Sequence, residues 1–141
     1  MIDIESRVFT AVRSAILAQF PGIDIKGESV DVPESFPCVT IEEIANTTLA
    51  RTQDESLEEH HATLGYAINV FTNTTNTKKS VAKKIANVAD NAMQELMFTR
   101  TFKSPTPNVD RTIFRLTMRY EGIVGQPIEV EGVESYPMYR R

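Results

Sequence analysis

The sequence predicts an α+β fold: one mostly antiparallel sheet of about five strands with two helices packed on one face. Three observations support this prediction, namely a long amphipathic helical pattern over 77–97 and alternating apolar residues over 61–73 and 112–124. Helices repeat every 3.6 residues and strands every two, so the two kinds of element can be told apart. The predicted order is helix, three strands, helix, two strands (αβββαββ).

The size and composition indicate a single globular domain. The chain has 141 residues, of which 41% are hydrophobic and 24% charged, close to globular averages. We expect one α+β domain over 1–124, followed by a C-terminal arm or edge strand over 125–141. No apolar run approaches the roughly 20 residues that span a bilayer. The N-terminus lacks the pattern of a secretory signal, so a soluble intracellular protein is expected.

The first half of the chain predicts a helix and two strands. The helix runs from Ile4 to Phe20 and ends at Pro21-Gly22. A short strand is expected within 23–32, and a longer one over 36–47. The polar, acidic stretch 48–60 then predicts a long exposed loop, which is uncommon in compact domains unless it is functional or disordered.

The strand over 61–73 shows the cleanest alternation in the sequence. We expect one of its faces to lie against the helices and the other to be less apolar. The residues predicted to face the helices are Ala62, Leu64, Tyr66, Ile68 and Val70.

The helix over 77–97 is the most clearly defined element. Asn76 or Thr77 can cap its start, and Asp90 is predicted on its solvent side. The apolar arc is wider than one-sided packing needs, which leaves room for a second contact with the first helix or another subunit. That arc contains Val81, Ala82, Ile85, Ala86, Val88, Ala89, Ala92, Met93, Leu96 and Met97.

The last predicted strands carry arginines. A short strand over 98–103 includes Arg100, a loop follows over 104–110, and Arg111, Arg115 and Arg119 share one face of the strand over 112–124. Arginines at alternate strand positions can line a polar sheet face, form cross-strand pairs, or line a subunit interface or a channel. The sequence alone leaves these readings open.

No pattern in the sequence predicts catalysis, a metal or a cofactor. His60 and His61 are adjacent on an extended segment, so they point to opposite faces and cannot easily bind one ion. No nucleophile elbow, phosphate-binding loop or dinucleotide fingerprint is present. The lone Cys38 lies in the apolar run FPCVTI and is expected to be a buried hydrophobe.

The charge pattern allows two readings of one basic group. The net charge of −4 argues against a general nucleic-acid binder. Lys78, Lys79, Lys83 and Lys84 nevertheless occupy the first two turns of the predicted long helix, where positive charge opposes the helix dipole. They form either a solvated helix face or a site for an acidic partner or phosphate.

Three segments resemble one protein family. They read FPCVTIEEI, HATLGYAINVFTN and MQELMFTRTFKSPTPNVDRTIFRLTMRYEGIV. With the element order and the size, they resemble the tail terminator proteins of long-tailed bacteriophages, also called tail completion, tail-to-head joining or minor capsid proteins. The resemblance covers about residues 1–124.

The resemblance implies a non-enzymatic protein of the virion tail or neck, assembled in the host cytoplasm, with no cofactor and no membrane. Such a protein assembles with itself into a ring, typically a hexamer, on the major tail tube protein. There it stops tube growth and presents a surface to the head connector or stopper protein. DNA passes through the lumen of the ring without specific binding.

The candidate interface residues are chosen from the exposed loop, the helix start, the arginine strand and the C-terminal arm. They are Arg51, Asp54, Glu55, Glu58, Lys78, Lys79, Arg100, Arg111, Arg115, Arg119, Arg140 and Arg141. Three alternatives stay open: another head–tail neck or joining protein, a nucleic-acid-binding module using 78–84 and the arginine strand, and a small α+β enzyme or ligand-binding domain.

Overall fold

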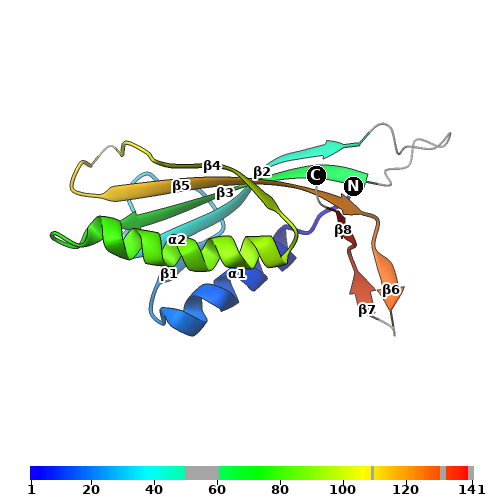
Figure 1. Ribbon diagram of the computed structural model, residues 1–141, viewed down its shortest axis with the longest axis horizontal. Helices are drawn as coiled ribbons and strands as arrows, with labels where there is room; N and C mark the ends of the chain where they lie inside the picture. The colour runs from blue at the N-terminus through cyan, green and yellow to red at the C-terminus, as the bar shows by residue number, and fades with distance from the viewer. Residues whose placement is uncertain (50–60, 109, 131–132, 140–141) are drawn as a thin grey trace.

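A computed structural model describes residues 1–49, 61–108, 110–130 and 133–139 (Figure 1). It confirms the α+β class and the order αβββαββ. The elements are α1 (Glu5–Gln19), β1 (Asp24–Lys26), β2 (Cys38–Thr48), β3 (His61–Thr72), α2 (Lys78–Glu95), β4 (Thr99–Pro105), β5 (Phe114–Gly125), β6 (Ile128–Val130), β7 (Val133–Ser135) and β8 (Met138–Tyr139).

The main sheet is mixed but mostly antiparallel. Its strand order is β1-β2-β3-β5-β4, and the short β8 pairs with the end of β5, which makes six strands. β1 runs parallel to β2, whereas every other pairing in this sheet is antiparallel. β6 and β7 pair only with each other and form a separate two-stranded sheet.

Both helices lie on one face of the sheet, as predicted, and run in opposite directions (Figure 1). The core between the layers contains Leu64, Tyr66 and Ile68 of β3, all fully buried. Burying a Val, Leu, Ile or Phe side chain contributes about 1.5–3 kcal/mol. The alanines of α2 let the helix approach the sheet closely, and α1 packs beside it. The second contact of the wide apolar arc is therefore α1.

Two local features at the end of α2 set the path into the sheet. Met97 adopts a left-handed backbone with φ +71°, and Phe98 N donates to Met93 O at 3.0 Å. This turn closes the helix and directs the Phe98 ring onto β5. A Cβ atom on Gly122 would lie 2.7 Å from Phe98 Cδ1, so only glycine fits there.

β5 begins two residues later than the sequence predicts. Asp110 Oδ1 accepts hydrogen bonds from Thr112 N at 2.9 Å and from Thr112 Oγ1 at 2.7 Å. Such a local side-chain bond competes with strand pairing and holds 110–113 as a turn. Arg111 therefore lies in this turn and not on the face of β5, which corrects the prediction that it shares that face with Arg115 and Arg119.

Candidate interaction surfaces

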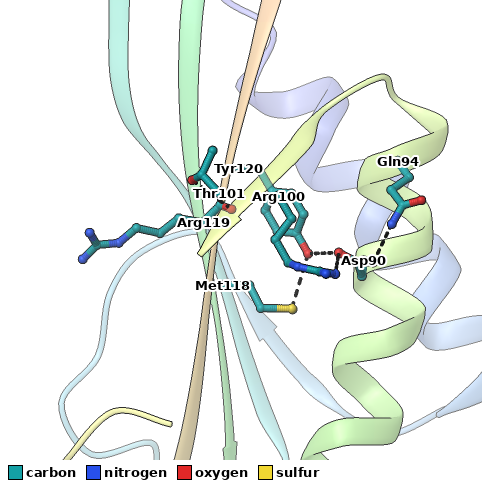
Figure 2. A network of polar contacts seen from close by, with 7 residues as sticks. All are labelled: Asp90, Gln94, Arg100, Thr101, Met118, Arg119 and Tyr120. Carbon is teal, nitrogen blue, oxygen red and sulfur yellow. Dashed lines mark hydrogen bonds and ion pairs between the residues drawn. The ribbon is translucent and has the colours of Figure 1, made fainter. Parts of the chain in front are cut away.

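A buried carboxylate ties α2 to the sheet. Asp90 is only 8% exposed, although the sequence placed it on the solvent side of the helix. Tyr120 Oη donates to Asp90 Oδ1 at 2.7 Å, and Gln94 Nε2 donates to Oδ2 at 2.7 Å (Figure 2). Arg100 Nη1 forms an ion pair with Oδ1 at 2.9 Å. The carboxylate is tolerated there because these three groups supply donors and a counter-charge.

The hydrogen-bonding role of Tyr120 depends on its staying protonated. Burial, followed by the hydrogen bond to Asp90 and the charge of that carboxylate, raises the pKa of Tyr120. The phenol therefore remains a donor at all physiological pH values. Arg100, a candidate interface residue, is held in the same network, and its contact with a partner stays a prediction.

Arg100 and Arg119 lie on opposite faces of the sheet, as Figure 2 shows. Arg100 pairs with Tyr120 and shares its face, whereas Arg119, the residue before Tyr120 in β5, points to the other face. A register shift between Arg100 and Phe102 places Phe102 opposite Arg119. Arg100 thus turns toward α2, while the Arg119 guanidinium lies 5.3 Å from the centroid of the Phe102 ring. We call the sheet face away from the helices the open face.

Arg115 is also on the open face, and it is held in place from two sides. Its Nε donates to Asn69 Oδ1 at 3.0 Å, and its guanidinium carbon lies 5.4 Å from the Phe71 ring centroid. Thr117 Oγ1 donates to the same Asn69 oxygen at 2.7 Å, and Asn69 is 3% exposed. The two arginines of β5 are therefore positioned by neighbouring strands, with cation–π contacts of the kind that favour Arg over an aromatic face.

A third basic group lies at the start of α2. We define the basic end as Lys78, Lys79, Lys83, Lys84 and Arg111. Lys78, Lys79 and Arg111 line one shallow surface depression, and Lys79, Lys83 and Lys84 line the next one along the helix. Lys78 Nζ donates to Thr112 O at 3.4 Å, and no carboxylate among the described residues forms an ion pair with any of the five.

Carboxylates gather at the other end of the helical layer. We define the acidic end as Asp3, Glu5 and Glu43. Glu5 N donates to Asp3 Oδ1 at 3.1 Å, and Glu43 N donates to Glu5 Oε2 at 3.3 Å. Burial raises the pKa of Glu43, the Tyr66 hydrogen bond opposes this, and the charges of Glu5 and Asp3 raise it further. No cation in the described part of the chain pairs with this cluster.

The C-terminal segment returns to the body after β6 and β7. Gly125 N donates to Pro137 O at 2.8 Å, and β8 pairs with β5 at Ile123 and Val124. Tyr136 packs against α1, where the Arg7 guanidinium lies 4.7 Å from its ring centroid.

Six candidate interface residues lie outside the described residues. They are Arg51, Asp54, Glu55 and Glu58 in the predicted loop, and Arg140 and Arg141 at the C-terminus.

Two of the groups considered for chemistry, Cys38 and His61, are packing residues, and His60 lies outside the described residues. Cys38 is fully buried, and burial raises the pKa of its thiol to about 11. His61 packs edge-on against Tyr139 at a centroid distance of 5.3 Å. Within the described residues, no three His, Cys, Asp or Glu side chains are grouped as a metal site would require. The helices described here include none that is long and apolar enough to cross a membrane.

No family model and no curated protein matches this sequence. Among solved structures, the fold is similar to a chain in the virion of a native gene transfer agent particle, with a TM-score of 0.59. The two chains are 12% identical, and the match covers 84% of this chain and 91% of that one. At 12% identity, this similarity shows that the two chains share a fold.

Proposed function

We propose that this protein is a structural component of a phage-like virion, and more specifically a tail terminator. The observation that supports this most directly is the fold likeness to a virion chain, which spans nearly the whole of both molecules. The sequence resemblance to tail terminator proteins leads independently to the same class. In this role the protein forms a ring, typically of six copies, on the tail tube, stops its growth and meets the head connector.

The sheet edges suggest how such a ring would be held together. An exposed strand edge pairs readily with another chain, and proteins protect such edges with bulges, charges, prolines or short strands. β4 has a register shift between Arg100 and Phe102, the charge of Lys103 and a terminal Pro105, and β1 has only three residues. At β4 and β1, assembly through side-chain surfaces is therefore favoured over strand addition.

The open face is the surface best suited to a partner in the virion. Arg115 and Arg119 are already positioned there by Asn69, Phe71 and Phe102. Side chains held in place lose less conformational entropy on binding than free ones. We assign this face to contact with the tail tube protein or the head connector, and DNA passes through the ring without specific binding.

Co-assembly with tail tube protein tests the function. Purified protein added to polymerising tubes is expected to shorten them and to appear as a ring at one end in electron micrographs. Analytical ultracentrifugation of the protein alone gives the number of copies. A strict monomer that leaves tube length unchanged would contradict the proposal. Arg119→Glu is expected to weaken capping, whereas the similarly exposed Arg13→Glu on α1 serves as the control.

Two alternatives give different outcomes in the same preparation. A head–tail neck protein of another kind would bind the connector and not the tube. A nucleic-acid-binding module would bind duplex DNA with an affinity that falls steeply as salt increases. A gene position between those for head connectors and the major tail protein would favour the tail terminator over both alternatives.

A further inference from the structure

Unbalanced positive charge lies along the outer side of α2. Lys79, Lys83 and Lys84 are exposed, and none has an ion-pair partner in the described residues. Cations in the first turns of a helix are unfavourable, because the N-terminal end of the helix dipole is itself positive. The basic end therefore presents a positive potential to solvent that an outside carboxylate would relieve.

Unbalanced negative charge lies around the start of α1. Asp3, Glu5 and Glu43 are linked through two backbone N–H groups, so their carboxylates are held near one another. Burial is the largest cause of the raised pKa of Glu43, and the charges of Glu5 and Asp3 raise this pKa further. A neighbouring cation would relieve the repulsion among the three carboxylates.

The two charged ends cannot neutralise each other within one molecule. α1 and α2 run in opposite directions, so their N-termini lie at opposite ends of the helical layer (Figure 1). α2 has 18 residues, which corresponds to about 27 Å of helix. That length is several times the screening distance of about 8 Å at physiological salt.

A second copy of the chain can satisfy both ends, and we propose that it does: the basic end of one subunit docks on the acidic end of the next. The contact joins two different surfaces, so it is heterologous, and repetition of one such contact closes a ring or extends a filament. The inference rests on the proposed function and names the surfaces through which the ring assembles. Exposed ion pairs contribute little individually, so this contact chiefly sets the register and the association rate.

Charge reversal tests the contact in the full chain. The variants are Lys79→Glu with Lys83→Glu, which makes the basic end acidic, and Asp3→Lys with Glu5→Lys, which makes the acidic end basic. Sedimentation velocity over a concentration series measures self-association. Each variant alone is expected to associate at least about tenfold more weakly than the wild type. A tenfold change in the dissociation constant corresponds to about 1.4 kcal/mol of binding free energy. An equimolar mixture is expected to recover association, because each variant supplies the surface that the other lacks.

Two sets of controls separate charge from folding. Arg13→Glu with Lys103→Glu makes the same change in net charge as Lys79→Glu with Lys83→Glu, at exposed positions outside both ends, and wild-type association is expected. Lys79→Gln with Lys83→Gln and Asp3→Asn with Glu5→Gln remove charge with less disturbance of the backbone hydrogen bonds. Circular dichroism and thermal unfolding verify that each variant is folded.

Several outcomes would overturn the inference. They are equal association of all variants, a mixture that stays dissociated, and a wild-type chain that remains monomeric. A Lys79/Lys83 variant that loses binding to a duplex DNA fragment but associates normally would instead make the basic end a nucleic-acid surface. Tube capping is measured in parallel: if wild type and both reversal variants all cap tubes, the proposed function stands and only this contact is wrong.

Discussion

The phenol of Tyr120 on β5 donates a 2.7 Å hydrogen bond to the carboxylate of Asp90 on α2, across the interface between the sheet and the helical layer. Both groups are almost fully buried, and Arg100 adds a counter-charge from β4. One polar network thus connects three elements that are distant in sequence. It also orients the edge strand β4, which carries Phe102 on the opposite face of the sheet, beside Arg119 of β5.

Tyr120→Phe is expected to lower the free energy of unfolding by about 1–2 kcal/mol, because it removes a donor from a buried carboxylate and changes little else. Urea denaturation monitored by circular dichroism measures the change. Tyr139→Phe, at a tyrosine that is 46% exposed, is the matched control and is expected to stay within about 0.5 kcal/mol of the wild type. Equal values for the two variants would contradict a role for the Asp90 bond.

Gly122→Ala is expected to destabilise the fold by about 1–3 kcal/mol, since the new methyl group would overlap the Phe98 ring. Gly27→Ala is the control, because its Cβ would make an ordinary contact at 3.7 Å with Phe9. A smaller ring at the clash should recover part of the loss, so Phe98→Leu combined with Gly122→Ala should cost less than the sum of the two single changes. Additive costs would show that the steric overlap is not the cause.

Stability is expected to be independent of Tyr66 and Tyr120 ionisation below about pH 9 and to fall above about pH 10. Burial raises the pKa of both phenols in the folded protein, followed by the charge of Glu43 for Tyr66 and the hydrogen bond to Asp90 for Tyr120. The unfolded chain loses these protons near pH 10, so it binds fewer protons than the folded chain above that pH. Each phenol then removes up to about 1.4 kcal/mol of stability per pH unit.

Denaturant unfolding from pH 8 to pH 11 measures this effect. Tyr66→Phe and Tyr120→Phe should each show a shallower alkaline loss than the wild type, because each lacks one of the two groups. Identical slopes in all three proteins would mean that other groups cause the alkaline loss.

Cys38 is expected to resist a disulfide reagent such as dithionitrobenzoate at pH 8 in the folded protein and to react fully in guanidinium chloride. Its side chain is buried, and its pKa of about 11 leaves only about one thiol in a thousand as the reactive thiolate. Ser14→Cys places a thiol at an exposed position of α1, where rapid reaction is expected. Fast reaction of Cys38 in the folded wild type would show that the β2 end of the sheet opens readily.

The alternation predicted over 61–73 correctly identified the side chains of β3 that face the helices, and the alternation over 112–124 correctly placed Leu116, Met118 and Tyr120 on one face of β5. Leu64, Ile68 and Met118 are buried in the main core, as expected. These faces could be predicted because the two-residue period is a local property of the chain. A strand with one buried face has apolar residues at every second position. The period of α2 likewise predicted its buried alanines.

The sequence by itself determined the class of fold, the order of the elements and the buried faces of the helices and long strands. The tertiary structure alone decided that Asp90 is buried, that Arg100 and Arg119 lie on opposite faces, and that the basic and acidic ends lie far apart. Each of these depends on pairings between distant segments: the register of β4 against β5 and the antiparallel placement of α1 and α2. Residue periodicity depends only on neighbours along the chain, so it cannot predict contacts between distant segments. Those contacts become visible only in the folded structure.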